Sequence, residues 1–449
     1  MSQVVQCPAL FISAPSSGQG KTTVTAALAR FHRNQGRKVR VFKTGPDFLD
    51  PMILEQASGN PVYQLDLWMG GENHCRELLY NAANDADIIL IEGVMGLFDG
   101  NSSSADLAKM FNIPVLVVIN ATAMAQTFGA IAYGLAHYDS NLPFAGVIAN
   151  QVASENHKDM IAESLPNDIR FYGALFRDEK FSLPSRHLGL HQAQEISDLD
   201  DRLEYVTNVL ASSDLDLLPP PVKFSPAKPI AIKASLTGKK IAVAKDQAFS
   251  FVYQANLDLL EAMGATLHYF SPLHDAELPD ADSLYLPGGY PELFLDELAN
   301  NSSIKNAIKA HANENKPIVA ECGGMLYLLE SLTDKYGNTG EMSGILTGKA
   351  IMQDKLANLG MHSVDLLPRE QTDEKADEKA DTKTDEQSSE INGHTYHHSQ
   401  MQTTLTPISM SKPQRKRGKA EPVFRIENTH ASYMHLYFPS NPKAAANLF

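Results

Sequence analysis

The sequence predicts two α/β domains joined by a proline-rich linker, and three observations lead to this prediction. Short apolar runs typical of buried strands alternate with segments of helical length in both halves of the chain. The length of 449 residues exceeds the size at which one hydrophobic core usually keeps growing. Between the halves, the stretch SSDLDLLPPPVKFSPAKP is rich in proline and lacks a helical period. We therefore expect a first domain over residues 1–211, a semi-rigid linker over 212–238 and a second domain over 239–449.

The first expected strand, loop and helix lie within LFISAPSSGQGKTT at residues 10–23. A glycine loop between a buried strand and a helix points backbone N–H groups at one spot, where a lysine adds charge and a threonine hydroxyl can hold Mg2+. The first glycine of the usual G-x-x-x-x-G-K-[ST] pattern is replaced here by Pro15. We predict a nucleotide site in which Thr22 is also a ligand of Mg2+. Its residues are Gly18, Gly20, Lys21 and Thr22.

The second expected strand, 38–43, ends in Lys43, and a turn with two acids follows it. Lys43 could reach the terminal phosphates of a nucleotide bound at the loop. Asp47 and Asp50 could cap the next helix. At the carboxyl end of a strand beside a phosphate loop, however, we favour their contact with Mg2+ or with a substrate. Asp47 is therefore a candidate Mg2+ ligand, and both acids are candidates for the substrate region.

Later strands of the first domain also end in polar residues. Glu92 closes the apolar run 88–91, and in phosphate-loop enzymes an acid here holds Mg2+ directly or through water. Asp99 follows in a glycine-flanked loop. Asn150 closes the run 145–150 and could read the edge of a nucleotide base, although an asparagine there is equally typical of a turn. The alternation as a whole predicts a doubly wound, mostly parallel sheet with its ligand at the strand carboxyl ends.

The second half resumes the alternation of strands and helices. Its expected elements are, in order, a strand at 241–244, a helix at 253–263, a strand at 266–270, a strand from 283 and a strand at 317–321. The strand from 283 runs into PGGY, a turn whose backbone N–H groups are free to bind an oxyanion. These features predict a second α/β domain that carries an anion-stabilising turn.

The strand 317–321 runs directly into Cys322, which two glycines and a helix follow. This is the pattern of a nucleophile elbow, because small residues allow the tight turn and the helix N-terminus favours a thiolate. We predict that Cys322 is a nucleophile, whereas Cys7 and Cys75 are inert residues of the core.

A cysteine nucleophile needs a base, and the C-terminal run NTHASYMHLYF at 428–438 offers His430 and His435. Their spacing does not choose between them. The histidines of GHTYHHS at 393–399 are further candidates, and they could equally line a substrate wall.

Composition limits which binding partners and which cellular compartment we expect for the protein. The net charge of -15, from 38 basic and 53 acidic residues, argues against nucleic acid as the main partner. Three cysteines without metal-ligand spacing favour a reducing compartment. The sequence shows no long apolar run, so we expect a soluble, cytoplasmic protein that does not use a membrane. The charged, near-repetitive segment at about 368–390 is expected to be a disordered surface insert.

Taken together, these motifs resemble those of the cobyrinic acid a,c-diamide synthases, the glutamine-dependent amidotransferases of the corrin pathway to cobalamin. The resemblance covers nearly the whole chain and follows the family's order. It rests on APSSGQGKTT, KTGPDFLDP, LDLWM, EGVMGLFDG, SSADLAKM, LPSRHLGL, PGGYPE, ECGGM, GHTYHHS and ASYMHLYF. It implies a P-loop NTPase-like first domain, similar to dethiobiotin synthetase, and a second domain similar to a class I glutamine amidotransferase.

The resemblance also implies the reaction and the roles of residues. ATP with Mg2+ would phosphorylate the a and c carboxylates of a corrin, and ammonia from L-glutamine would displace the phosphate. Cys322 would form a glutamyl thioester and His435, in the family's S-Y-x-H element, would raise its nucleophilicity, which leaves His430 a bystander. Lys21, Thr22 and Glu92 would take the phosphate and magnesium roles, with Asp47, Asp50 and Asp99 near the acyl phosphate. Leu436 and Tyr437 follow His435, so the sequence names no orienting carboxylate for the base.

We therefore predict an ATP-dependent ligase that uses L-glutamine and acts on cobyrinate. The same reaction on metal-free hydrogenobyrinate or on nickel-sirohydrochlorin is the close alternative. A partitioning ATPase of the MinD or ParA type is a rival from another class, but it expects a lysine at the position of Ser16. A tetrapyrrole-binding module with an inactive glutaminase is a second rival, and a homodimer is left open.

Overall fold

The computed structural model describes residues 3–178, 185–186, 189–190, 192–210, 214–366 and 389–449. The chain divides into two compact units, unit 1 over Met1–Pro229 and unit 2 over Ile230–Phe449. Each unit is an α/β fold built around a largely parallel sheet, as the sequence predicts.

Unit 1 is built on a parallel sheet in which the strands run in the order β3-β2-β4-β1-β5-β6-β7. The strand order differs from the chain order because the connections from β1 to β2, from β3 to β4 and from β4 to β5 each pass over one strand. This is the doubly wound arrangement expected. The strands are β1 (Val5–Ser13), β2 (Val39–Thr44), β3 (Tyr63–Leu65), β4 (Ile88–Glu92), β5 (Val115–Asn120), β6 (Phe144–Val152) and β7 (Phe171–Phe176).

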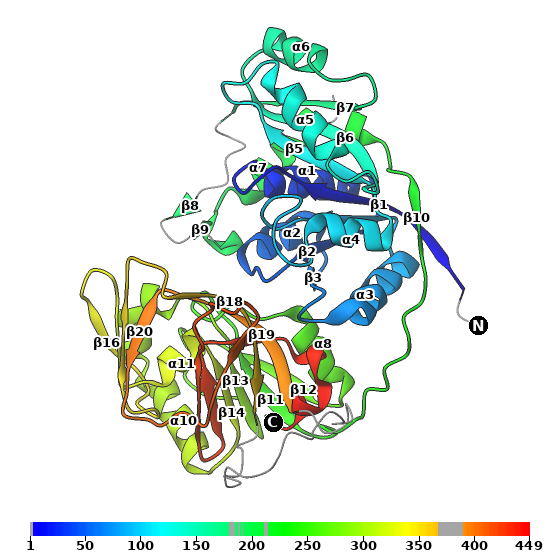
Figure 1. Cartoon of the computed structure of the whole chain (residues 1–449). Helices are drawn as coiled ribbons and strands as arrows, with labels where there is room; N and C mark the ends of the chain where they lie inside the picture. The colour runs from blue at the N-terminus through cyan, green and yellow to red at the C-terminus, as the bar shows by residue number, and fades with distance from the viewer. Residues whose placement is uncertain (1–2, 179–184, 187–188, 191, 211–213, 367–388) are drawn as a thin grey trace. The chain divides into compact units, whose positions relative to one another are not determined.

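Helices cover both faces of this sheet (Figure 1). Alternate side chains of a strand point to opposite faces, so Phe11 and Ile91 join one core cluster while Ile12 and Leu90 join another. The first cluster packs against α3 (Gly71–Asp85), α4 (Ser104–Phe111), α5 (Thr127–His137) and α6 (Glu155–Glu163), and the second against α1 (Lys21–Asn34), α2 (Leu49–Ser58) and α7 (Leu199–Leu210). Cys7 and Cys75 are buried in the first cluster, as predicted.

The expected linker contains a strand that the sequence reading missed. Residues Pro221–Phe224 form β10, which pairs antiparallel with the N-terminal part of β1, from Val5 to Pro8. Val222 and Phe224 are buried, and Pro221 occupies the first position of the strand, where its missing N–H is tolerated. The stretch 212–238 therefore includes a strand of unit 1, which the alternation of buried and exposed residues after Pro221 favours. Other short elements of unit 1 are β8 (Ser185–Arg186), β9 (Gly189–Leu190), η2 (Ala193–Glu195) and η3 (Asp214–Asp216).

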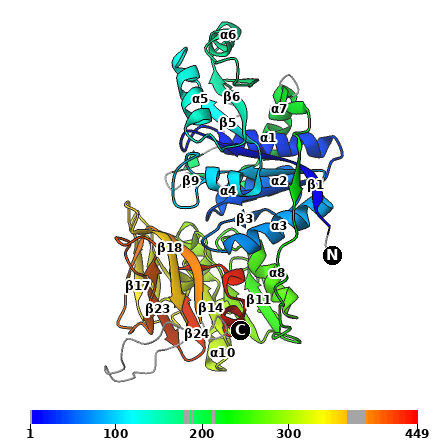
Figure 2. The same cartoon turned by 45° about the vertical axis from the view of Figure 1, so that its right-hand side comes forward.

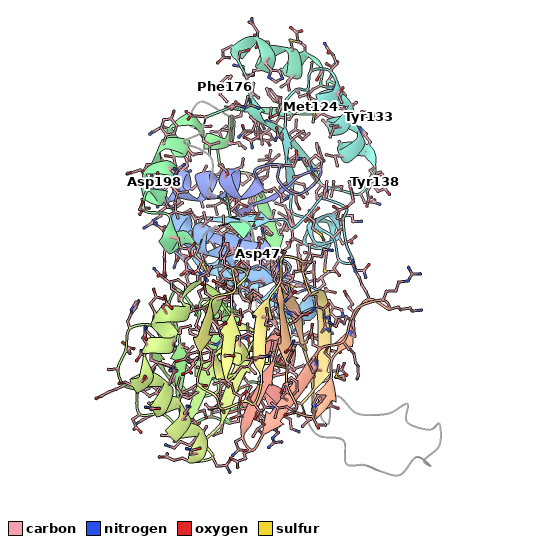
Figure 3. All side chains as sticks on the ribbon, turned by 90° about the vertical axis from the view of Figure 1, so that its left-hand side faces the viewer. Asp47, Met124, Tyr133, Tyr138, Phe176 and Asp198 are labelled. Atoms are coloured by element: carbon pink, nitrogen blue, oxygen red, sulfur yellow. The ribbon has the colours of Figure 1, made fainter. Side chains whose placement is uncertain are left out.

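Helix α5 packs on the sheet with only one face. Phe128 and Ala132 are fully buried, whereas Tyr133 is 52% exposed and Tyr138, directly after the helix, is 79% exposed. These tyrosines lie on the outside of unit 1, away from Asp47 (Figure 3). In the part of the chain that the structure describes, no helix combines the length and the apolar character that crossing a membrane requires.

The main sheet of unit 2 has the order β12-β11-β13-β14-β24-β23-β21, and its first five strands are parallel (Figure 2). They are β11 (Lys240–Ala244), β12 (Thr266–Phe270), β13 (Ser283–Leu286), β14 (Ile318–Glu321), β21 (Ser409–Met410), β23 (Pro422–Ile426) and β24 (Thr429–Ser432). The helices of this unit are α8 (Gln254–Ala262), η4 (Pro291–Leu293), α9 (Leu295–Asn300), α10 (Ser302–Asn313), α11 (Gly323–Leu328), η6 (Phe438–Ser440) and α12 (Pro442–Ala446).

Two small sheets follow the elbow helix, and the sequence reading did not anticipate them. One contains β16 (Thr339–Glu341), β15 (Ser331–Thr333), β17 (Lys349–Met352) and β20 (Ser399–Gln402). The other contains β22 (Lys412–Pro413), β18 (Asn358–Asp365), β19 (Glu390–His397) and β25 (His435–Leu436). The predicted insert at 368–390 lies outside the described residues, apart from its last two, where Glu390 begins β19.

Candidate active sites

A pocket of about 560 Å3 opens where the loop after β1 leads into α1. Gly18 and Gly20 have φ angles of 76° and 94°, a region that favours glycine. A Cβ on Gly20 would lie 2.1 Å from Nδ2 of Asn150, so the loop also needs glycine for space. The pocket is lined by nine of the predicted residues, which are Gly18, Gly20, Lys21, Thr22, Lys43, Asp47, Asp50, Glu92 and Asn150.

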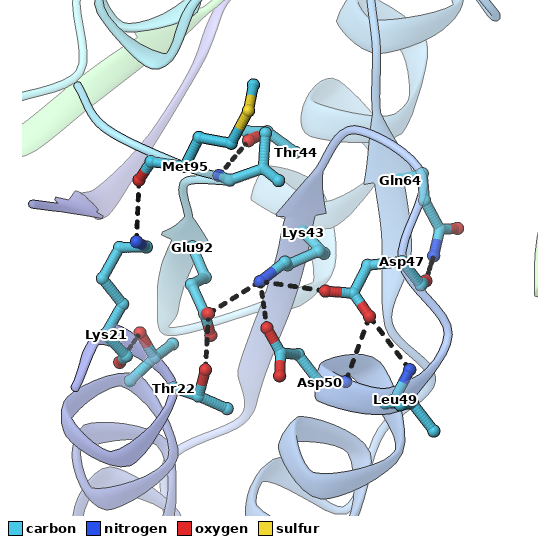
Figure 4. A network of polar contacts seen from close by, with 12 residues as sticks. Lys21, Thr22, Lys43, Thr44, Asp47, Leu49, Asp50, Gln64, Glu92 and Met95 are labelled. Carbon is cyan, nitrogen blue, oxygen red and sulfur yellow. Dashed lines mark hydrogen bonds and ion pairs between the residues drawn. The ribbon is translucent and has the colours of Figure 1, made fainter. Parts of the chain in front are cut away.

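Lys43, on β2, is the centre of a buried network of charges in this pocket (Figure 4). Its ammonium lies 2.8 Å from Oε1 of Glu92 and 3.3 Å from Oδ2 of Asp47, and it also pairs with Asp50. The Lys43 side chain is 2% exposed and that of Glu92 is 0% exposed. Burial alone would lower the pKa of Lys43, but the three carboxylates outweigh it and raise the pKa well above its usual value. Lys43 is therefore a fixed cation beside the phosphate loop.

Asp47 makes the capping contacts that the sequence offered as one interpretation, and its contact with Mg2+ or a substrate stays a prediction. Its Oδ1 accepts the N–H groups of Leu49 at 2.9 Å and of Asp50 at 3.3 Å, which caps the first turn of α2. Its Oδ2 faces Lys43. Burial, followed by the charge of Asp50, raises the pKa of Asp47 to about 7. The amide of Gln64 donates to the Asp47 carbonyl oxygen at 3.2 Å and holds the turn from the next strand.

Lys21, Thr22 and Glu92 lie together at the start of α1. The Lys21 ammonium donates to the carbonyl oxygens of Met95 at 2.7 Å and Ser16 at 3.2 Å, and burial lowers its pKa. The Thr22 hydroxyl donates to Oε1 of Glu92 at 2.9 Å. Burial raises the pKa of Glu92, and among the described residues its Oε2 atom has no hydrogen-bond partner.

This donor set fits a magnesium ion that is shared with a nucleotide. Mg2+ typically takes one or two protein ligands and completes its shell with phosphate oxygens and water. Thr22 and the unpartnered oxygen of Glu92 supply such ligands, whereas Asp47 lies across the Lys43 ammonium from Thr22 (Figure 4). Across the described ranges, no three His, Cys, Asp or Glu side chains form a metal-binding group by themselves.

Asp99 and Asn150 brace loops around the pocket. Asp99 accepts the N–H of Gly96 at 2.9 Å and stabilises the turn after β4. The Asn150 amide donates to the carbonyl oxygen of Gln19 at 2.9 Å, and its oxygen accepts the N–H of Gln151 at 2.9 Å. Asn150 thus holds the phosphate loop from β6, and its reading of a base edge stays a prediction.

Cys322 occupies a sharp turn between β14 and α11 in unit 2. Its φ of 44° is positive, which is strained for a residue with a side chain. Its N–H donates to the carbonyl oxygen of Ser432 at 2.8 Å. A Cβ on Gly323 would lie 2.9 Å from the nitrogen of Gly289, and one on Gly324 only 2.0 Å from the Leu286 carbonyl oxygen. The geometry is that of the predicted elbow, and the Gly289 turn packs directly against it.

The structure separates the two candidate bases. His435 lies against the same turn as the elbow, since a Cβ on Gly288 would be 2.2 Å from its Cε1 atom. His430 instead lines a different, small cavity of about 40 Å3 together with Arg425. Burial lowers the pKa of His435 to about 3 and raises that of the Cys322 thiol, so both groups are held neutral. A neutral imidazole is the form that can accept a proton.

The GHTYHHS segment lies beside Cys322 and His435. His394 stacks on His435 with ring centroids 4.9 Å apart, and its Nδ1 bonds to the Tyr253 hydroxyl at 2.8 Å. His397 bonds to Glu421 at 3.0 Å, and both residues are buried. The segment therefore packs against His435, and its role as a substrate wall stays a prediction.

Sequence reasoning missed two buried residues that contact β25, the strand that contains His435. The carboxylate of Glu321 accepts the N–H of Leu436 at 3.2 Å, and the amide of Asn256 donates to the Leu436 carbonyl oxygen at 2.8 Å. An acid that ends an apolar strand was the available signal, since Glu92 shows the same pattern and was noticed.

Comparisons with known proteins match both units. A model described as the CobQ/CobB/MinD/ParA nucleotide binding domain matches residues 10–190, and one described as the CobB/CobQ-like glutamine amidotransferase domain matches residues 240–443. The hydrogenobyrinate a,c-diamide synthases of Pseudomonas aeruginosa and Stutzerimonas stutzeri are each 54% identical, over 99% and 98% of this chain and 97% and 98% of their own. The cobyrinate a,c-diamide synthase of Herminiimonas arsenicoxydans is 43% identical over 98% of this chain and 96% of its own.

Proposed function

This chain belongs to the family of cobyrinate and hydrogenobyrinate a,c-diamide synthases, and we propose from this that it converts the a and c side-chain carboxylates of a corrin to amides. The reaction uses ATP and L-glutamine and belongs to cobalamin biosynthesis. One observation carries the proposal. A nucleotide-type pocket and a cysteine elbow occur on a single chain that matches these synthases over nearly its full length.

The ring without its metal is the substrate that the comparisons favour. Both relatives at 54% identity are named for hydrogenobyrinate, whereas the relative at 43% is named for cobyrinate. Cobyrinate, expected from the sequence, stays the second candidate.

The first unit would activate the carboxylate. A carboxylate oxygen attacks the terminal phosphorus of ATP, the bond to ADP breaks, and an acyl phosphate forms. Phosphate is a good leaving group, so ammonia can then add to the acyl carbon and release phosphate and a proton. Lys21 and Lys43 lie at the pocket with ammonium groups that can balance the charge of the transferred phosphoryl group.

Mg2+ belongs to this proposal as the partner of ATP, held by Thr22 and Glu92. When bound, it neutralises charge on the phosphate oxygens. Asp47, Asp50 and Asp99 are proposed to form the region that receives the activated carboxylate. Asp47 suits this role best, because its pKa of about 7 would let it accept the proton that the attacking ammonia loses.

The second unit would release the ammonia. His435 takes the proton of the Cys322 thiol, and the sulfur adds to the side-chain amide carbon of glutamine. His435 then gives the proton to the amide nitrogen, the carbon–nitrogen bond breaks, and ammonia leaves as a thioester forms. Water then hydrolyses the thioester to glutamate. The N–H of Gly323 bonds to the Cys322 side chain, and the nitrogen of Gly289 lies against Gly323. These N–H groups are proposed to stabilise the oxyanion.

A partitioning ATPase of the MinD or ParA type is less well supported, because it would not need the Cys322 elbow or the match over 240–443. An inactive glutaminase is disfavoured by the positions of Cys322 and His435 on either side of one glycine turn. The free cysteines, Cys7, Cys75 and Cys322, support the cytoplasm as the compartment.

The test is to supply hydrogenobyrinate and cobyrinate separately, each with ATP, Mg2+ and either glutamine or ammonium, and to identify products by mass. A diamide from at least one corrin is expected, with ADP and phosphate formed for each amide. Absence of an amidated product from both corrins under all these conditions would refute the proposal.

A further inference from the structure

The peptide unit between His435 and Leu436 is held by side chains from distant parts of unit 2. Its N–H donates to Oε1 of Glu321 at 3.2 Å. On its other side, a Cβ on Gly393 would lie 2.2 Å from the His435 carbonyl oxygen, so Gly393 packs tightly on the same unit. Strand β25 contains only two residues, which pair with β19, so these contacts add to a short ladder.

The Glu321 side chain is itself held in place. Its Oε2 accepts the hydroxyl of Tyr285 at 3.0 Å, and it is 2% exposed. Glu321 ends β14, which pairs in parallel with β24, and Glu321 lies opposite Ser432 in that register. Glu321, the residue before Cys322, therefore contacts Leu436, the residue after His435, directly.

Asn256, on α8, completes the arrangement from the opposite direction. Its Nδ2 donates to the Leu436 carbonyl oxygen at 2.8 Å, and its Oδ1 accepts the N–H of Phe438 at 2.8 Å. Asn256 is fully buried. Both polar groups of Leu436 are thus satisfied by buried side chains, and such groups would be costly to leave unpaired.

We infer that Glu321, supported by Asn256, is the positioning residue of the glutaminase site and holds the His435 ring at the Gly288 turn. This inference rests on the proposed function, in which His435 accepts the proton of Cys322. It supplies what the sequence lacks, because no carboxylate follows His435 at the position that could orient its ring. Glu321 acts here through the backbone of β25 and not by touching the substrate.

The test compares Glu321→Leu with Glu321→Gln in the full chain. Leucine removes the acceptor, whereas glutamine keeps an oxygen for the Leu436 N–H and an amide for the Tyr285 oxygen. For Glu321→Leu we expect kcat of glutamate release to fall about 100-fold with KM for glutamine changed less than about threefold, because misplacing a base by about 1 Å costs that much. Glu321→Gln should restore most of the rate.

Three further measurements separate positioning from general damage. Ammonium-dependent amidation should stay near the wild-type rate in Glu321→Leu. Glu330→Leu is the matched control, since Glu330 also accepts a backbone N–H, that of Gly348 at 3.1 Å, and its loss should leave glutamate release unchanged. If Glu321→Leu misfolds and loses both glutamate release and ammonium-dependent amidation, the Asn256→Ala variant tests the inference instead. A selective loss of glutamate release in that variant supports the inference, and an unchanged rate overturns it.

Two other results would also overturn the inference. One is wild-type glutamate release in Glu321→Leu. The other is an equal loss in Glu321→Leu and Glu321→Gln, which would indicate that an acceptor oxygen at this position is not what the site needs. Alkylation of Cys322 by a chloromethyl ketone analogue of glutamine gives a readout without a corrin. If neither corrin is amidated, the proposed function fails while this alkylation rate, compared across the variants, still tests the positioning.

Discussion

Replacing Lys43 by methionine should destabilise unit 1 strongly. The lysine side chain is 2% exposed and its partner Glu92 is 0% exposed, so methionine leaves a buried carboxylate without its cation. Removing one partner of a buried ion pair typically costs about 3–5 kcal/mol in free energy of unfolding. Asp47 and Asp50 would then face Glu92 without the ammonium between them. We therefore expect a loss in the upper part of that range at pH 7.

The loss should shrink as the pH falls. In the wild type, burial has already raised the pKa of Asp47 to about 7, and removing Lys43 raises carboxylate pKa values further. A group whose pKa is raised by folding favours the folded state at low pH and loses that contribution as the pH rises through the folded pKa. The deficit of Lys43→Met should thus be larger at pH 8 than at pH 5.

The chain offers a specific probe for this measurement. Its single tryptophan, Trp68, lies in unit 1 just after β3, so fluorescence during urea unfolding reports on that unit. Lys38→Met is the matched control, because the Lys38 side chain is 47% exposed and pairs with a half-exposed Asp85. Its effect should be about 1 kcal/mol or less. Adding Glu92→Gln to Lys43→Met should recover part of the loss. The reasoning would be refuted if Lys43→Met were no more harmful than Lys38→Met.

Four further outcomes follow from the two sites. Cys322→Ala should abolish amidation with glutamine yet keep it with ammonium, and loss of both would make Cys322 structural. Lys21→Ala should lower both amidation rates by about 100-fold or more, and a near-normal rate with either donor would contradict its phosphate role. Gly288→Ala places a methyl group 2.2 Å from a ring atom of His435 and should suppress glutamate release, whereas Gly134→Ala, in open space on α5, should not. Because burial raises the pKa of the Cys322 thiol, its alkylation by iodoacetamide should accelerate steadily from pH 6 to 9, and a plateau near pH 7 would contradict this.

Much of the main fold could be predicted because its signals are local. Apolar runs such as 88–91 and 115–120 alternate with helices, and their side chains divide between two cores as a doubly wound sheet demands. The two small sheets of unit 2 could not be predicted in the same way. Their strands are paired across distant parts of the chain, as with β17 and β20. The local pattern of apolar and polar residues does not predict which distant strands pair with each other.

The same distinction applies to the sites. The glycine loop before α1 and the turn at Cys322 are contiguous motifs, so the sequence could predict both local geometries. Spacing left His430 and His435 both open, and the resemblance named His435. The structure shows His435 at the Gly288 turn and His430 at another cavity. The contact of Asn256 with Leu436 joins residues 180 positions apart, and no spacing rule could suggest it.

Strand β10 has a consequence for any attempt to produce unit 1 alone. A chain shortened at residue 211 would lose Pro221–Phe224 and leave Val5 to Pro8 with a bare hydrogen-bonding edge. Exposed edges of this kind recruit strands from other molecules, so the shortened protein should self-associate and precipitate. A chain that continues past Phe224 keeps its own edge covered. A chain for unit 1 should therefore end after β10, beyond the end of α7 at Leu210.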